Sequence, residues 1–146
     1  MTLPAGFTQM TPEEMSSRFG RATGKPPLAA YADKQRHAVI VFTSSPGKKP
    51  YTDSQLAEFL KLARQAFEKR LEGLSWHKDE VISVNGRSWG RMHYSVKNRD
   101  TDARNDTYMT QIPGAMFSVN LSAPVDRWPS SQPVLMAAFK SIRIKE

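Results

Sequence analysis

Three histidines, His37, His77 and His93, are the first residues that could do chemistry in this chain. Zinc sites take three or four protein ligands, usually Cys and His, with some of them only a few residues apart. The histidines have no such short spacing, and the chain has no cysteine to complete a ligand set. Only the fold could bring His37 and His93 together, on adjacent strands. We therefore expect no metal site, and we interpret each histidine as a strand or surface residue.

The segment 100–106 begins with the Asp-x-Asp pattern of a calcium-binding loop. Such a loop needs a glycine at its sixth position and a glutamate at its twelfth. Asn105 and Gln111 stand at those positions, and Arg99 and Arg104 bring positive charge. The segment therefore predicts a solvated loop with internal ion pairs and no bound calcium.

Motifs for catalysis are weak as well. Paired-carboxylate hydrolysis needs two acids across a cleft, whereas the neighbours Asp79 and Glu80 should point to opposite faces of a strand. There is no Gly-x-Ser-x-Gly nucleophile turn and no glycine-rich phosphate loop. We expect that the protein is not an enzyme and uses no cofactor. A hydrolase whose Ser, His and acidic side chains meet only in the fold is kept as a third hypothesis.

Basic and aromatic residues alternate on one face of a predicted strand, at Arg87, Trp89, Arg91 and His93. Single-strand nucleic-acid binders stack bases on aromatic rings while cations follow the phosphates. The simpler interpretation is that Trp89 lies in the core and the arginines at its rim. No RNP-type pattern supports RNA binding, so a nucleic acid or an anionic surface is the alternative partner.

Aromatic residues, Met and Arg are also enriched at protein–protein interfaces. We therefore predict that the partner is another protein, and an acidic one would suit the net charge. Trp128, in a predicted loop at 124–129, is a candidate exposed anchor, although it could instead cover the end of the sheet. The candidate partner-binding residues are Trp89, Arg91, Tyr108, Met109, Trp128 and Met136.

The 146 residues suit one domain, spanning 1–146. Lys and Arg number 21 against 14 Asp and Glu, which gives a net charge of +7. That charge favours encounters with anionic partners, but the basic residues are spread along the chain, as is typical of solvated faces. The N-terminus does not resemble a signal peptide, and no run approaches the ~20 apolar residues of a membrane helix. We expect either a cytoplasmic protein or an envelope protein whose targeting segment and lipid anchor are absent from this chain.

The clearest predicted element is a helix over about 53–71. Thr52 and Gln55 form a capping-box pattern before it. One apolar stripe at helical spacing follows, made of Leu56, Phe59, Leu60, Ala63, Phe67 and Leu71. A short helix over 11–20 and a late helix capped by Ser130 or Ser131 are also predicted.

Predicted strands cover 28–32, 37–43, 81–84, 87–96, 106–113, 115–122 and 141–145. Between the third and fourth, Asn85 and Gly86 supply the positive φ angles of a type I′ hairpin turn. Runs of strands interrupted by a long helix and a late helix favour the α+β class. We expect a twisted, mainly antiparallel sheet with the long amphipathic helix on one face.

Short segments in a particular order carry a resemblance that covers nearly the whole chain. They are 3–7 (LPAGF), parts of 11–33, 85–89 (NGRSW), 105–109 (NDTYM) and 138–144 (AFKSIRI). Together they resemble the PsbP-like superfamily, particularly its DcrB-type bacterial lipoproteins and accessory proteins. The resemblance implies a twisted antiparallel sheet flanked by helices and a non-catalytic, partner-binding role. No functional residue of the family maps onto this sequence.

The leading hypothesis is therefore a non-catalytic accessory or binding protein of the bacterial envelope or of a secretion system, acting by protein–protein contact. Neutralising a toxin, as an immunity protein does, or escorting a secreted effector would be a specific form of that role. The resemblance favours a periplasmic or envelope-associated location, with the cytoplasm as the alternative. Binding of single-stranded nucleic acid or of an anionic surface is the alternative function.

Overall fold

The computed structural model describes residues 1–23, 27–46, 52–97 and 102–145. Its elements in chain order are β1 (Thr8–Gln9), α1 (Pro12–Thr23), β2 (Ala29–Ala32), β3 (Val39–Pro46), α2 (Asp53–Arg70), β4 (Ser75–Val84), β5 (Arg87–Val96), β6 (Ala103–Ile112), β7 (Ala115–Pro124), the 3-10 turn η1 (Val125–Arg127) and α3 (Trp128–Lys140).

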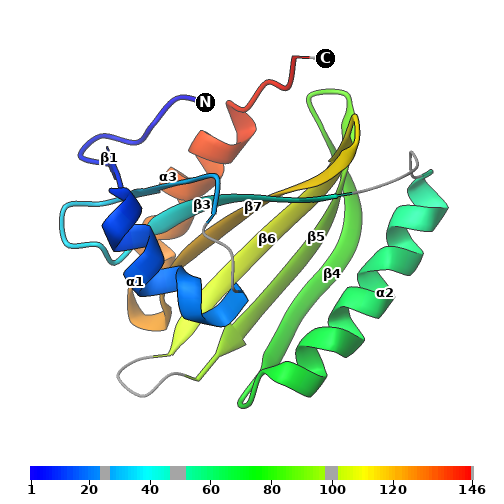
Figure 1. Ribbon diagram of the computed structural model, residues 1–146, viewed down its shortest axis with the longest axis horizontal. Helices are drawn as coiled ribbons and strands as arrows, with labels where there is room; N and C mark the ends of the chain where they lie inside the picture. Colours follow the sequence, from blue (N-terminus) through cyan, green and yellow to red (C-terminus); the bar gives the residue numbers. More distant parts are fainter. Residues whose placement is uncertain (24–26, 47–51, 98–101, 146) are drawn as a thin grey trace.

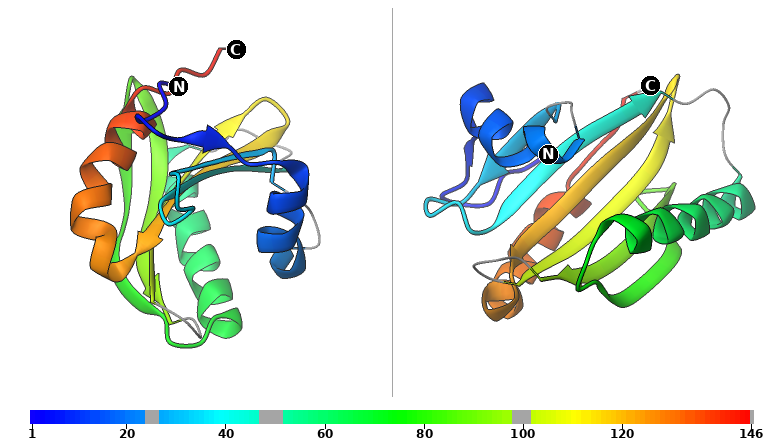
Figure 2. Two further views of the ribbon diagram at one scale, coloured as in Figure 1. Left: turned by 90° about the vertical axis from the view of Figure 1, so that its left-hand side faces the viewer. Right: turned by 60° about the horizontal axis from the view of Figure 1, so that its bottom comes forward.

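The strands form one seven-stranded sheet in the order β1-β2-β3-β7-β6-β5-β4 (Figure 1). Every neighbouring pair is antiparallel. Helices α1 and α2 lie on one face of this sheet and α3 lies on the other (Figure 2). The predicted α+β fold, with an antiparallel sheet, a long amphipathic helix and a late helix, is confirmed.

Helix α2 begins and packs as its sequence predicts. The Thr52 side chain accepts a hydrogen bond from the Gln55 amide at 3.2 Å, and the Gln55 side chain accepts one from the Thr52 amide at 2.9 Å. Leu56 and Leu60 of its apolar stripe are buried against the sheet. Gly90 of β5 allows this close approach, because a Cβ at that position would lie 3.0 Å from a methyl group of Leu60.

The Asn85–Gly86 turn joins β4 to β5, with φ angles of 55° and 76°. These positive values are those of the predicted type I′ turn. The turn sets the register of the β4–β5 hairpin, which pairs Val84 with Arg87 and, beyond a register shift between Trp76 and Lys78, ends with Ser75 opposite Ser95.

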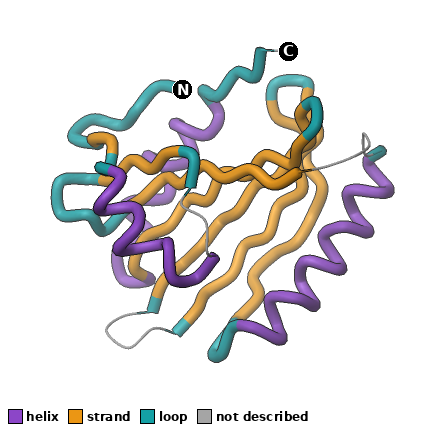
Figure 3. Tube along the Cα trace, viewed as in Figure 1, coloured by secondary structure: helices purple, strands orange, loops and turns teal. Residues whose placement is uncertain are grey.

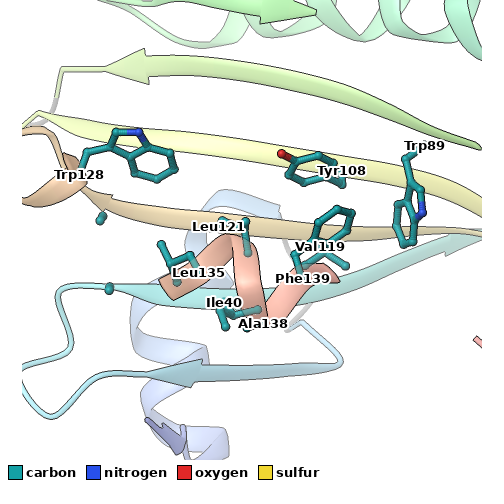
Figure 4. Close-up of a cluster of buried hydrophobic side chains, with 11 residues drawn as sticks. Ile40, Trp89, Tyr108, Val119, Leu121, Trp128, Leu135, Ala138 and Phe139 are labelled. Carbon is teal, nitrogen blue, oxygen red and sulfur yellow. The ribbon is translucent and has the colours of Figure 1, made fainter. Parts of the chain in front are cut away.

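Three apolar clusters fill the spaces between sheet and helices. The cluster between α1 and the sheet contains Met10, Met15, Ala30, Ala32, Val39 and Val41. The cluster between α2 and the sheet contains Leu56, Leu60, Met92, Tyr94, Met109 and Met116. The cluster between the sheet and α3 contains Ala38, Ile40, Trp89, Tyr108, Val119, Leu121, Ala123, Trp128, Leu135, Ala138 and Phe139 (Figure 4).

Several predicted boundaries are wrong. Helix α1 runs on to Thr23, β3 runs on to Pro46, and the short strand β1 was not predicted. The sequence also predicts loops over the charged stretch 97–105 and over 44–50, which contains Pro, Gly and Lys. Strand β6 begins at Ala103, inside the first of these, because Ala103 pairs with both Val96 and Pro124. Residues 98–101 of the first loop and 47–50 of the second lie outside the described residues.

The predicted terminal strand over 141–145 is also wrong. The chain after α3 is a turn and a loop (Figure 3). Its alternating Ile142 and Ile144 pack against the α3 cluster. The Asn85 side chain donates to the carbonyls of Lys140 and Ile142 at 2.8 and 3.3 Å, so the segment is attached to the β4–β5 turn through a side chain.

Candidate functional site

The middle of the sheet is left uncovered on the face that carries α1 and α2. Strands β6 and β7 pass between these helices, and in the described part of the chain no helix lies in front of them (Figure 1). Residues directly opposite each other in an antiparallel pair share a face. By this register the strip consists of Thr43, Asn105, Thr107, Ser118, Asn120 and Ser122, which we call the open face.

The alternation of β7 explains why this face is polar. Val119 and Leu121 point to α3 and are buried, whereas Ser118, Asn120 and Ser122 point the other way and are half-buried. The alternation of Val119 and Leu121 in the sequence predicts the apolar side of this strand. It did not single out the polar side, because alternating Ser and Asn residues look like an ordinary solvated surface until the helices are placed.

The amides and a hydroxyl of the open face form a short network. Thr107 Oγ1 donates to Asn120 Oδ1 at 2.8 Å, and Asn120 Nδ2 donates to Asn105 Oδ1 at 3.1 Å. No side chain of the open face is ionisable. Thr107 is buried, whereas Asn105 and Asn120 are half-buried. Amide and hydroxyl groups suit the hydrogen-bonding groups of a partner chain better than they suit acid–base chemistry.

The opposite face carries a charged cluster at β4, β5 and β6. The Arg91 guanidinium makes two bonds to the Asp106 carboxylate, Nε to Oδ1 at 2.9 Å and Nη2 to Oδ2 at 3.0 Å. Arg91 also pairs with Glu80 at 3.2 Å, and the Tyr108 hydroxyl donates to Asp106 Oδ2 at 2.8 Å. Burial, followed by the Asp106 charge, raises the pKa of Tyr108.

His93 completes this cluster as a neutral imidazole. Burial, with Arg104 and Arg91 adding to it against the opposing charge of Asp106, lowers the pKa of His93 to about 4. Its Nε2 accepts a hydrogen bond from Arg104 Nε at 2.9 Å, and Arg91 Nη2 lies 3.4 Å from its Nδ1. Because both ring nitrogens face guanidinium groups, we interpret His93 as part of the packing between strands.

The fold brings His77, not His37, next to His93, with ring centroids 5.2 Å apart. Among the described residues no three His, Asp or Glu side chains are grouped as a metal site would require. In the calcium-like segment, Asp106 turns to Arg91, while 100–101 lie outside the described residues. Asp79 pairs with Arg64 of α2 and Glu80 with Arg91 on the opposite face, so their predicted divergence is confirmed.

The candidate partner-binding residues do not form one surface. Trp89, Tyr108, Met109 and Trp128 are buried, with 6% or less of each residue exposed. Arg91 is engaged by two carboxylates, and Met136 is half-buried near the Tyr108 hydroxyl. Figure 4 shows Trp128 and Trp89 toward opposite ends of the α3 cluster, with Tyr108 between them.

The expected exposed anchor at Trp128 is therefore corrected. Helix α3 begins at Trp128 itself and not after Ser130. The indole lies against His93, with centroids 5.4 Å apart, and the Arg104 guanidinium carbon is 5.7 Å from the ring centre. Trp128 covers the end of the sheet, which was the alternative interpretation of this residue.

No protein-family model matches the chain, and no curated protein matches it in sequence. Solved structures do match. The cyanobacterial PsbP protein CyanoP of Synechocystis has a TM-score of 0.64 at 16% identity, over 97% of this chain and 84% of its own. PA94 of Pseudomonas aeruginosa, a protein of unknown function, has a TM-score of 0.63 at 16% identity, over 100% of this chain and 87% of PA94.

A third match is LpqN of Mycobacterium tuberculosis, which is involved in cell envelope biogenesis. Its TM-score is 0.59 at 18% identity, over 95% of this chain and 76% of LpqN. The chain therefore has a PsbP-like fold. No helix within the described ranges is both long and apolar enough to cross a membrane.

Proposed function

We propose that the protein is a non-catalytic accessory protein that binds another protein through the open face. The observation that carries this proposal is the polar strip between α1 and α2, where Asn105, Thr107 and Asn120 are hydrogen-bonded to one another and exposure ranges from buried Thr107 to exposed Thr43. Sheets in globular proteins usually cover an apolar face with helices and expose a polar face to water. Here one face carries two helices and still keeps a polar strip between them.

The proposal extends to the type and the setting of the protein. The order of sequence segments supports a DcrB-type member of the PsbP-like group, contained in one domain over 1–146. The involvement of LpqN in cell envelope biogenesis supports a periplasmic or envelope-associated location. Within that setting, escorting a secreted effector or neutralising a toxin are the specific forms of binding that we propose. The polar strip between α1 and α2 suits hydrogen bonds to one segment of such a partner.

A matched pair of variants tests the proposal. Ser118→Arg places a long cation in the middle of the open face, at a half-buried position. Val134→Arg places the same group on α3, where Val134 is 44% exposed on the opposite side of the sheet. Both variants should unfold in urea at nearly the wild-type concentration.

The readout is quantitative mass spectrometry of proteins captured by each variant from extracts of the native host. We expect a partner that the wild type and Val134→Arg retain and that Ser118→Arg loses. Equal capture by both variants would contradict the use of the open face. Capture of no protein above background by the wild type would contradict the accessory function itself.

The alternative of single-stranded nucleic-acid binding was based on Trp89 and its neighbouring arginines, which are not available for that role in the structure. Trp89 is 3% exposed and meets Phe139 of α3 edge to face, with centroids 5.1 Å apart. It cannot stack on a base in this fold, and Arg91 is held by Asp106. The net charge of +7 remains as the argument for an anionic surface. Binding that depends on charge alone should weaken steeply as salt is raised.

A further inference from the structure

A pocket of about 360 Å³ opens where the β4–β5 turn meets the C-terminal end of α3. Its walls come from the turn, from the start of β5 and from the loop after α3. This is the α3 side of the sheet, away from the open face. The volume falls in the range of small-molecule sites, which is roughly 300 to 1,000 Å³.

Two polar side chains hold the walls of the pocket in place. Asn85 Nδ2 donates to the carbonyl of Lys140, which has no partner within the helix because α3 ends there, and to the carbonyl of Ile142 in the following loop. Arg143 Nη1 donates to the same two carbonyls, both at 3.0 Å. The loop that should have been a strand is therefore fixed to the hairpin turn.

The lining of this pocket divides into an apolar floor and a cationic rim. Trp89 and Phe139 are buried at the floor, and Ile142 and Ile144 of the loop are half-buried beside them. Arg143 stands at the exposed rim. Among the described residues, none of those that line the pocket is acidic.

Arginine in such a position recognises a carboxylate. The guanidinium group presents several N–H donors in one plane, and it binds carboxylates through paired hydrogen bonds. Arg143 makes both of these hydrogen bonds through Nη1, and among the described residues its Nε and Nη2 donate to no carbonyl or carboxylate. Arg87 lines the same pocket and adds positive charge near it, and its Nη1 donates to the Gln111 carbonyl at 2.8 Å.

We propose that this pocket binds a small amphipathic carboxylate, an aliphatic or aromatic acid whose apolar part lies on Trp89 and Phe139 and whose carboxylate meets Arg143. Neither part alone explains the lining. A neutral apolar ligand would leave the positive charge of the rim unmatched, and a bare inorganic anion would leave the apolar floor exposed to water. The proposal is independent of partner binding at the open face.

The probe is octanoate, titrated into the full chain while backbone amide NMR signals are recorded. We expect saturable shifts centred on Gly86 and Ile144, with a Kd of about 0.1 to 1 mM. Octan-1-ol keeps the chain and lacks the charge, and acetate keeps the charge and lacks the chain. Both should bind at least about tenfold more weakly, which corresponds to about 1.4 kcal/mol.

Two variants and a control locate the site. Arg143→Gln should weaken octanoate binding by at least about fivefold, because a charge-assisted hydrogen bond is lost. Ile144→Trp should fill the pocket and abolish binding. Arg127→Gln removes the same charge from an exposed position at η1 and should leave the Kd unchanged.

Four outcomes would overturn the proposal, and the first three concern affinity. These are no saturable octanoate shifts up to several times the expected Kd, equal affinity for octan-1-ol, or equal weakening by Arg143→Gln and Arg127→Gln. Shifts centred on the open face would also overturn it, because the ligand would then occupy the other side of the sheet.

Discussion

Arg91 holds both oxygens of the fully buried Asp106 carboxylate, at 2.9 and 3.0 Å, and thereby joins β5 to β6 on the α3 side of the sheet. A buried carboxylate depends on such a partner, because leaving water costs an unpaired charge several kcal/mol. The pair therefore holds β5 and β6 together on the side of the sheet opposite the open face.

Breaking the pair of Arg91 and Asp106 should strongly lower the stability of the fold. Asp106→Asn leaves Arg91 with the half-exposed Glu80 alone and removes an acceptor from Tyr108. We expect a loss of about 3–5 kcal/mol in the free energy of unfolding, measured by urea denaturation. Asp79→Asn, which removes a partly exposed ion pair with Arg64, should cost about 1 kcal/mol or less. Similar losses for the two variants would show that the Asp106 pair is not a buried contact.

His93 should make stability fall in mild acid. Its pKa is about 4 in the folded protein against about 6.5 in an unfolded chain, so the unfolded state takes up the proton first. The contribution of His93 to the free energy of unfolding is complete above pH 6.5. It is lost as the pH falls from 6.5 to 4, by at most about 1.4 kcal/mol per pH unit.

The matched variant for this effect is His93→Gln, which cannot titrate. Urea denaturation at steps between pH 6.5 and 5 should give a flatter dependence for His93→Gln than for the wild type. This window lies above the range in which ordinary carboxylates titrate. An unchanged slope in the variant would mean that His93 is protonated in the folded protein as easily as in the unfolded chain.

Trp128 should behave as a core residue. Trp128→Ala removes a buried indole from contact with His93 and Arg104, and we expect a loss of about 3–5 kcal/mol. Val134→Ala on the exposed side of α3 should change stability by about 0.5 kcal/mol or less. A Trp128→Ala protein of wild-type stability that loses a partner would restore Trp128 as a surface anchor.

Asn85 has two roles that two substitutions can separate. Asn85→Gly keeps the positive φ of 55° without strain and loses only the bonds to the Lys140 and Ile142 carbonyls. Asn85→Ala loses these bonds and also strains the backbone, by about 1–2 kcal/mol. The alanine variant should therefore unfold at a lower urea concentration than the glycine variant. The reverse order would mean that the turn does not require a positive φ.

Local signals account for what the sequence predicted well. The Thr52–Gln55 capping box and the Asn85–Gly86 turn are each complete within a few residues, and both are present in the structure. The predictions of secondary structure fail where a contact between residues distant in the sequence determines the conformation. The alternation of Ile142 and Ile144 fits a strand, yet Asn85 takes the carbonyls and the segment stays a loop. Trp128 is followed by Pro129, which is as compatible with the first turn of a helix as with a loop.

The candidate sites follow the same rule. Residue type alone selected Trp89 and Trp128, and the placement of α3 buries both. The open face could not be predicted from the sequence, because the positions of α1 and α2 determine that Ser118 and Asn120 lie in a strip between two helices. The pocket at the β4–β5 turn likewise joins residues 84–89 to 139–144, which no short pattern connects.

The most direct test of the open face as the binding surface is site-specific photo-crosslinking in the native host. A photoreactive phenylalanine analogue at Ser118 should yield a discrete adduct with one partner protein, and the same analogue at Val134 should not. An adduct formed equally at both positions, or at Val134 alone, would contradict the account.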